Sequence, residues 1–224
     1  KCFSGTDTEL LINLHEVELP EEIYKKLKGM FAYVIYDIKM NKLIIGRDII
    51  GEKIMYYYED DDVLIVSSEI GPILELKPSI SINRDVLREY FFTRHLLTPE
   101  DTVFNGIRLI KAGHLLEYNL DDMQFNQVLK RELYNYIDPG VIEKNRKRSN
   151  EDILEEFEAI LLSTAKSLVP ISRDYFSVFS GGIDSSLSSI YLSECKEAKE
   201  YIALTFPEKD NVSSQIGEFA KVLR

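Results

Sequence analysis

Cysteine and histidine are scarce in this sequence of 224 residues. The two cysteines, Cys2 and Cys195, are too few for a framework of disulfides, so we expect a reducing, cytoplasmic setting. The three histidines (His15, His95 and His114) do not have the spacing of metal ligands, and we interpret them as structural residues.

Long apolar runs and excess positive charge are also lacking. No apolar run is long enough to span a bilayer, and no signal-peptide pattern is present. The formal net charge is -11, which disfavours nucleic acid and anionic membranes as partners. A phosphate site in so acidic a protein needs local hydrogen-bond donors and a cation such as Mg²⁺.

The apolar residues, 45% of the total, are numerous enough to form a buried core. In the first part of the chain, two segments with helical spacing are followed by short apolar segments separated by tight turns. We expect two helices packed on an antiparallel meander, which is an α+β arrangement. The expected helices cover residues 8–18 and 21–28, and the expected strands cover 30–37, 42–48, 54–58 and 63–68. Further on, we expect a helical turn at 69–76, a helix capped by Asn83, and a hairpin or one long strand at 107–120.

Residues 138–150 lack apolar periodicity, so we place a linker at 141–150, between a first domain (1–140) and a second domain (151–224). In the second domain, helical and strand patterns alternate. The expected order is a helix at 150–168, a strand at 176–179, a helix from 183, a strand at 201–206 and a helix at 215–223. This alternation predicts an α/β fold with a parallel, Rossmann-like sheet that binds its ligand at the carboxyl ends of the strands.

The junction between the first of these strands and its helix has the pattern Ser-Gly-Gly-x-Asp-Ser, from Ser180 to Ser185. Gly181 and Gly182 allow a positive φ and a close approach of the backbone to a ligand, and the N-terminus of the helix favours an anion. The alternative is an ordinary strand–turn–helix junction that Asp184 or Ser185 caps. The full pattern resembles the pyrophosphate loop of ATP pyrophosphatases, and it lacks the Gly-Lys-Ser/Thr ending of the lysine-bearing P-loop.

Several segments of the first domain, taken with this loop, resemble glutamine-hydrolysing asparagine synthetases of the bacterial kind. The segments that carry the resemblance are 3–9, with Asp-Thr-Glu at 7–9, then 29–37, 46–48, 51–53, 56–57, 67–70 and 180–186. The resemblance implies two incomplete domains and therefore a fragment of a longer protein. The first would be the C-terminal part of a glutamine amidotransferase domain, an αββα sandwich of the N-terminal-nucleophile type. The second would be the start of a Rossmann-like ATP pyrophosphatase domain.

The resemblance also implies a reaction. The first domain would release ammonia from glutamine, and a tunnel would carry the ammonia to the second domain. There, ATP with Mg²⁺ would adenylate aspartate, and ammonia would displace AMP to give asparagine. Glutamine, aspartate and ATP are thus the expected partners, without nucleic acid or membrane, and the resemblance is compatible with a homodimer.

Individual residues acquire expected roles in the same way. Asp7 would bind the amino group of glutamine as a buried carboxylate, although the first turn of a helix is also a place for a capping residue. Phe179 and Leu204 would line the adenine site, and the alternative for both is core packing. Ser180, Gly181, Gly182, Asp184 and Ser185 would bind ATP and its pyrophosphate, and Asp184 would also meet Mg²⁺.

The catalytic nucleophile of the family, an N-terminal cysteine followed by glycine, has no counterpart in this sequence, so no catalytic residue is assigned. Cys2 is too close to Asp7 and is followed by Phe3, and we interpret it as an apolar strand residue. We therefore expect no glutaminase activity from this chain alone. Three alternatives stay open, namely a related amide ligase, another ATP pyrophosphatase, and a nucleotide-binding module without catalysis.

Overall fold

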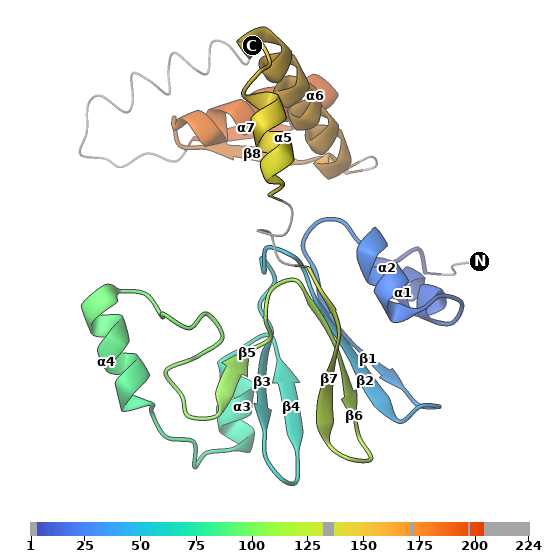
Figure 1. Cartoon of the computed structure of the whole chain (residues 1–224), viewed down its shortest axis with the longest axis vertical. Coiled ribbons are helices and arrows are strands. Elements are labelled where there is room, and N and C mark those ends of the chain that lie inside the picture. Colours follow the sequence, from blue (N-terminus) through green and yellow to red (C-terminus); the bar gives the residue numbers. More distant parts are fainter. Residues whose placement is uncertain (1–3, 132–136, 171–172, 197, 204–224) are drawn as a thin grey trace. The chain divides into compact units, whose positions relative to one another are not determined.

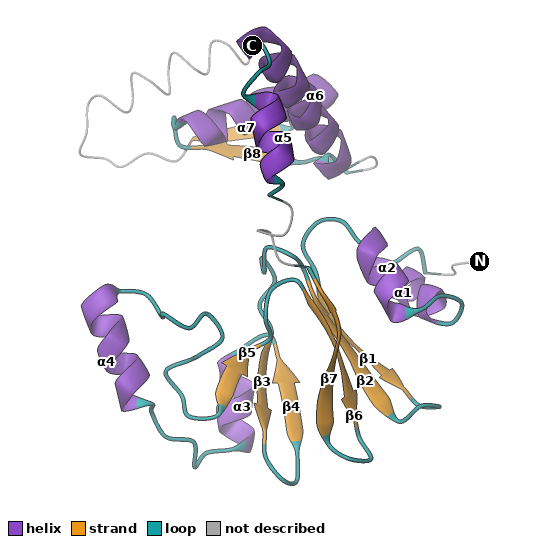
Figure 2. Cartoon of the chain, in the orientation of Figure 1, coloured by secondary structure: helices purple, strands orange, loops and turns teal. Residues whose placement is uncertain are grey.

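A computed structural model describes residues 4–131, 137–170, 173–196 and 198–203 of the chain (Figure 1). The chain divides into two compact units, Lys1–Asp138 and Pro139–Arg224, and each is described by itself. The first unit combines two sheets with short helices, whereas most of the described residues of the second unit are helical (Figure 2). Among the described helices, none has the length and apolar character needed to cross a bilayer.

The first unit contains four helices and seven strands within its described residues. They are α1 (Asp7–His15), α2 (Pro20–Lys26), β1 (Ala32–Asp37), β2 (Lys42–Arg47), β3 (Tyr56–Glu59), β4 (Leu64–Ser67), α3 (Ile70–Leu76), α4 (Arg84–Thr93), β5 (Ile107–Leu109), β6 (His114–Asn119) and β7 (Gln124–Lys130). The expected helices and the first four strands are present at nearly the predicted positions, and Asn83 caps α4 as predicted.

The strands form two antiparallel sheets, with the orders β1-β2-β6-β7 and β4-β3-β5. The prediction of a single meander is therefore wrong, because the hairpins β1–β2 and β3–β4 lie in different sheets. β2 is buried along most of its length, and β6 pairs with its second edge. The segment 107–120 is neither a hairpin nor one strand, since β5 and β6 belong to different sheets and the chain turns between them at Gly113, whose φ is 74°.

Two apolar clusters show how the layers pack. One lies between the two sheets and contains Ile45, Met55, Ile110 and Tyr118. The other contains Tyr24 of α2 together with sheet residues, so it joins this helix to the outer face of the four-stranded sheet. On the far side, α3 packs on β3 and β4 and buries Ile73 completely. The order helix, sheet, sheet, helix is consistent with the expected sandwich of an N-terminal-nucleophile amidotransferase domain.

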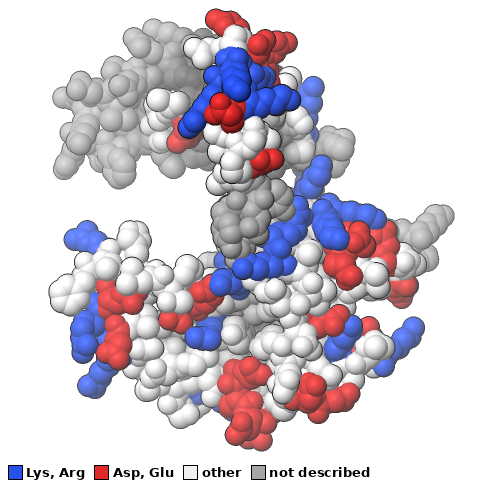
Figure 3. Space-filling view, viewed as in Figure 1, with Lys and Arg blue, Asp and Glu red and all other residues white. Residues whose placement is uncertain are grey.

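Acidic side chains gather on the surface around two hairpin turns of the first unit (Figure 3). Glu59 ends β3, Asp60 and Asp61 belong to the β3–β4 turn, and Asp121 and Asp122 belong to the β6–β7 turn. Negative charge is therefore concentrated at these two turns of the first unit.

The second unit begins with α5 (Pro139–Asn145) and α6 (Asn150–Leu168), and continues with β8 (Phe176–Phe179), α7 (Ile183–Cys195) and β9 (Glu200–Ala203). Ser149 caps α6, because its side chain accepts a hydrogen bond from the backbone N–H of Asp152. β8 and β9 pair in parallel, and α6 packs against α7. Helix α5 occupies part of the segment 141–150 that we interpreted as a linker. The helix expected at 215–223 and the second half of the strand expected at 201–206 lie outside the described residues.

Candidate functional site

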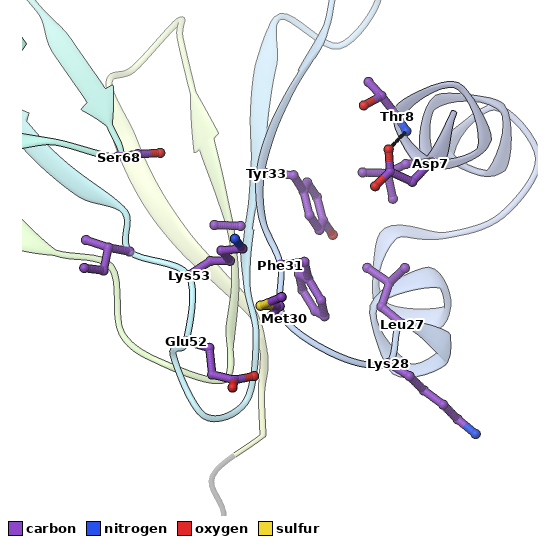
Figure 4. A pocket seen from close by; sticks show the side chains of 13 residues that line it. Asp7, Thr8, Leu27, Lys28, Met30, Phe31, Tyr33, Glu52, Lys53 and Ser68 are labelled. Carbon is purple, nitrogen blue, oxygen red and sulfur yellow. Dashed lines mark hydrogen bonds between the residues drawn. The ribbon is translucent and has the colours of Figure 1, made fainter. Parts of the chain in front are cut away.

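A cavity of about 700 Å³ lies in the first unit, between the α1–α2 layer and one end of the four-stranded sheet (Figure 4). Its wall combines residues that are far apart in the sequence. They come from α1 (Asp7, Thr8, Leu11), from the end of α2 to β1 (Leu27, Lys28, Met30, Phe31, Ala32, Tyr33), from the segment after β2 (Glu52, Lys53, Ile54) and from the end of β4 (Ser68). A volume of this size, with a mixed polar and apolar wall, suits a small organic ligand.

Asp7 lies at the cavity as the first residue of α1. Thr6, not Asp7, caps the helix, because the Thr6 side chain accepts a hydrogen bond from the backbone N–H of Glu9. The Asp7 carboxylate accepts a hydrogen bond from the N–H of Thr8 (2.8 Å), as Figure 4 shows. The side chain is exposed, so the expectation of a buried carboxylate is wrong. Capping therefore falls to Thr6, and the Asp7 carboxylate does not serve as the helix cap.

The segment from residue 48 to residue 53 owes its shape to Asp48, which is 2% exposed. Its carboxylate accepts five hydrogen bonds from backbone N–H groups. One oxygen, Oδ1, receives those of Ile50 (3.2 Å), Gly51 (2.6 Å) and Glu52 (3.0 Å), and the other, Oδ2, receives those of Lys53 (3.0 Å) and Phe31 (3.3 Å). Burial alone would raise the pKa of Asp48, but these hydrogen bonds outweigh it and hold the pKa below its usual value.

Arg47 fixes the same segment through its carbonyl groups. The buried guanidinium donates to the backbone oxygen of Lys53 (2.7 Å), of Gly51 (2.8 Å) and of Ile110. Burial lowers the pKa of Arg47, and the neighbouring Asp48 opposes this change. Arg47 therefore binds carbonyl groups, and Asp48 binds N–H groups, of the backbone from residue 50 to residue 53. This fixed backbone places Glu52 and Lys53 at the cavity.

Beneath α1, Tyr33 packs against His15 with a ring-centroid separation of 5.9 Å in an edge-on arrangement. The Tyr33 hydroxyl and both His15 ring nitrogens are buried and make no hydrogen bond within the described part of the chain. Burial, with a smaller effect of Tyr24, raises the pKa of Tyr33, and burial lowers the pKa of His15. Both rings are therefore neutral at pH 7.

The absence of a side chain at Gly46 leaves the space that the Tyr33 ring occupies. The two residues face each other across β1 and β2, and a Cβ atom on Gly46 would lie only 2.5 Å from two ring carbons of Tyr33. This distance is far below van der Waals contact, so a side chain at position 46 would displace the ring. Tyr33 thus occupies the space that the missing side chain leaves open.

In the second unit, the predicted phosphate loop lies where β8 ends and α7 begins. Gly181 has a φ of 80°, as expected for such a loop, whereas Gly182 has a φ of -75° and forms the N-cap of α7 without a side-chain hydrogen bond. The N-cap role proposed for Asp184 or Ser185 is therefore wrong. Asp184 lies exposed in the first turn.

Serine hydroxyl groups organise this loop. The Ser185 hydroxyl accepts a hydrogen bond from the N–H of Ser180 (3.2 Å) and donates one to the carbonyl of Gly182 (3.2 Å). Ser177 and Ser189 are buried and joined by a hydrogen bond of 2.8 Å, and Ser189 donates to the carbonyl of Ser185 (2.9 Å). Strand, loop and helix are thus connected through hydroxyl groups.

The remaining predicted residues are placed as follows. Phe179 is the last residue of β8, and Leu204 and Cys2 lie outside the described residues. Within the described residues, no three His, Cys, Asp or Glu side chains lie close enough to hold a metal ion.

Sequence reasoning did not assign roles to Arg47, Asp48, Tyr33 or Lys53. Arg47 and Asp48 were considered only as part of the segment 46–48, which carries the family resemblance. A charged pair at the end of an apolar strand, shortly before Gly51, is nevertheless a signal of buried hydrogen bonding. For Tyr33 and Lys53, no local pattern exists, because the contacts that define their roles come from other segments.

Comparison with known proteins gives the same identification as the sequence motifs. Residues 1–130 match the family of glutamine amidotransferase domains. The chain is 30% identical, over 82% of its length and 34% of the relative, to a Methanocaldococcus jannaschii protein whose name assigns it provisionally to glutamine-hydrolysing asparagine synthetases. It is 32% identical to the glutamine-hydrolysing asparagine synthetase 3 of Bacillus subtilis over 53% of its length and 19% of that protein.

A third relative has a different name. The microcin J25-processing protein McjC of Escherichia coli is 23% identical over 80% of this chain and 31% of the relative. The chain spans about a third or less of the length of these relatives. From the match over its first 130 residues, the chain belongs to the family of glutamine amidotransferase domains, and it is similar to the form found in glutamine-hydrolysing asparagine synthetases.

Proposed function

We propose that the full-length protein forms an amide by using ATP and the side-chain nitrogen of glutamine, and that its product is asparagine. The balanced reaction is aspartate, glutamine, ATP and water to asparagine, glutamate, AMP and pyrophosphate. The observation that carries the proposal is the presence, in one chain, of an amidotransferase-family unit with a cavity at Asp7 and a second unit with the loop from Ser180 to Ser185.

In the first unit, Asp7 binds the ammonium group of glutamine. Its carboxylate is at the cavity, it is not used as the helix cap, and an ion pair with hydrogen bonds is the strong way to hold an ammonium. The Arg47–Asp48 pair contributes indirectly by fixing the opposite wall of the cavity before the ligand binds, which lowers the entropic cost of binding.

In the second unit, the loop binds the phosphates of ATP. Gly181 has the positive φ of an anion-binding turn, and the first N–H groups of α7 have no intrahelical acceptors. The hydroxyl group of Ser180 adds a donor, and the hydroxyl group of Ser185, which donates to the carbonyl of Gly182, holds the shape of the loop. ATP supplies the adenylyl group that activates the carboxylate, and Mg²⁺ supplies charge for the leaving pyrophosphate. Asp184 would hold this ion together with phosphate oxygens, and Phe179 and Leu204 would line the adenine site.

The division of labour can be tested in the full-length enzyme with two variants. Asp184→Asn should lower ATP-dependent pyrophosphate release by about 100-fold, the size of effect seen when one group that stabilises developing charge is removed, and leave glutamine hydrolysis intact. Asp7→Ala should raise the KM for glutamine about 10- to 100-fold, the value of one hydrogen bond to a charged group, and leave ammonia-dependent synthesis intact.

Matched controls exist in both units. Asp152 lies in the first turn of α6 and Asp85 in the first turn of α4, so Asp152→Asn and Asp85→Ala repeat the changes at helix starts outside the two sites. If Asp184→Asn and Asp7→Ala each abolish both activities equally, the assignment of two separate sites is wrong. If calorimetry shows ATP binding while no amino acid supports pyrophosphate release, the protein is a nucleotide-binding module.

A related amide ligase is the second candidate, supported by the similarity to the microcin-processing protein over four fifths of the chain. The two candidates differ only in the carboxylate that is activated. Pyrophosphate release with aspartate, compared with release in the presence of other amino acids and carboxyl-bearing peptides, distinguishes them.

A further inference from the structure

Helix α1 carries Asp7 at its first residue but has no buried residue of its own. Its ring contact with the sheet is made at the other end, where His15, the last residue of the helix, meets Tyr33 of β1. This contact lies about two turns from Asp7. Together with the packing of α1 on α2, it fixes the direction of the helix and with it the position of Asp7. A helix transmits such a displacement along its length because its backbone is stiff over this distance.

Tyr33 is held firmly at this contact. Its ring lies over Gly46, where a Cβ atom would approach the ring carbons to 2.5 Å. Its ring also lies 5.9 Å from that of Phe31, which is tied to Asp48 through its N–H. Figure 4 shows the ring directed from β1 toward α1, with the hydroxyl at the helix side of the cavity.

We propose that Tyr33 is a positioning residue for the ammonium-binding carboxylate of Asp7, and that Gly46 is required because it gives the Tyr33 ring its place. The aromatic ring, not the hydroxyl, performs this role, since the hydroxyl makes no hydrogen bond to any described residue. The inference rests on the proposed role of Asp7 in binding glutamine.

The test uses steady-state kinetics of the full-length enzyme with glutamine and, separately, with ammonia. Tyr33→Ala should raise the KM for glutamine about tenfold or more, because a displaced binding group loses its alignment with the ligand. The ammonia-dependent rate should not change. Tyr33→Phe should restore the KM for glutamine, since the ring is kept. Tyr36→Ala is the matched control, because Tyr36 lies on the same strand with its side chain 51% exposed.

A second pair of variants tests the role of Gly46. Gly46→Ala should raise the KM for glutamine by displacing the ring, and the combination Gly46→Ala with Tyr33→Ala should be no worse than Tyr33→Ala alone. The ammonia-dependent rate of each variant shows whether the variant is folded. If Tyr33→Ala loses both the glutamine-dependent and the ammonia-dependent activity, Tyr33→Leu is measured in its place.

The outcomes separate this inference from the proposal on which it rests. If Asp7→Ala raises the KM for glutamine but Tyr33→Ala does not, the positioning role of Tyr33 is refuted and the role of Asp7 stands. If Asp7→Ala leaves this KM unchanged, the glutamine-binding proposal itself fails. Additive effects of the changes at positions 33 and 46 would also refute the inference.

Discussion

Replacing Asp48 by asparagine gives a direct test of how the cavity wall is held. Asparagine has nearly the same shape, but one of its two terminal groups is an NH₂ donor. If its oxygen takes the place of Oδ1, the N–H groups of Ile50, Gly51 and Glu52 keep an acceptor. The N–H groups of Lys53 and Phe31 then face another donor, and they are enclosed in a region where Asp48 is 2% exposed.

The expected loss of stability follows from these two groups. A buried donor without an acceptor costs about 1–3 kcal/mol, so two of them cost about 2–6 kcal/mol in the free energy of unfolding. The hydrogen bond from Phe31 is long at 3.3 Å and contributes least, which places the expected loss near 3 kcal/mol. The three hydrogen bonds that remain also lose their charge, which acts in the same direction.

The pH dependence has a definite sign. The pKa of Asp48 is lower in the folded chain than its value of about 3.9 in an unfolded chain, so the folded state binds fewer protons. Its contribution to stability is complete above about pH 4 and is lost as the pH falls through the folded pKa. The difference between the wild-type chain and Asp48→Asn should therefore be constant from pH 7 to pH 5 and smaller at pH 3.

The assay is urea unfolding followed by far-ultraviolet circular dichroism, because the chain has no tryptophan for fluorescence. Asp37→Asn is the matched control, since Asp37 also accepts two backbone hydrogen bonds, from Lys39 and Met40, but in an exposed turn. This control should lose less than about 1 kcal/mol. A loss below about 1 kcal/mol for Asp48→Asn, or a difference that grows below pH 4, would refute the role assigned to Asp48.

Two further changes concern buried hydroxyl groups. Tyr33→Phe should raise the free energy of unfolding by about 1 kcal/mol in urea unfolding, because it removes a buried hydroxyl that has no partner among the described residues; a loss of stability would show that the hydroxyl is satisfied. Ser189→Ala should lower the midpoint of thermal unfolding by leaving the buried hydroxyl of Ser177 without its acceptor, at a cost of about 1–3 kcal/mol. Ser193→Ala is its control and should lie within about 0.5 kcal/mol of the wild-type chain; equal losses at both positions would contradict the role of Ser189.

The local elements of the fold and the hairpins β1–β2 and β3–β4 could be predicted from the sequence, but the pairing between distant strands could not. The helices at α1, α2, α4 and α6 follow from apolar spacing and capping residues, which are properties of neighbouring positions. β2 pairs on one edge with β1 and on the other edge with β6, which lies about 70 residues further along the chain. Nothing in the pattern of β2 or of β6 specifies the pairing of these two strands.

Strand β7 was missed for a different physical reason. Its pairing with β6 shifts between Leu115 and Leu116, where Leu129 and Gln127 are the partners and Val128 is the extra residue. Such a bulge changes which face the following side chains occupy, so Phe125 packs between the sheets while Val128 and Leu129 pack on the helix side. The strand therefore lacks the alternation by which strands are recognised in a sequence.

The same distinction between local and long-range features applies to the two candidate sites. The loop from Ser180 to Ser185 could be predicted because its residues are contiguous, and its positive φ is found at Gly181. The cavity at Asp7 could not, since its wall comes from four separate segments. The sequence also did not decide whether Asp7 is a capping residue, because this depends on the hydrogen bond from the N–H of Glu9, which the Thr6 side chain accepts.

The hydrogen bonds that hold the segment after β2, residues 48–53, determine which positions of the cavity wall can be mutated. Arg47 and Asp48 bind only backbone groups of this segment, so the side chains of Glu52 and Lys53 have no part in maintaining its path. Gly51 is the exception, because its φ is 75° and a Cβ atom there would lie 2.9 Å from Arg47. Positions 52 and 53 can therefore be randomised in a library of variants while the backbone is retained, and ligand preference can be selected separately from stability.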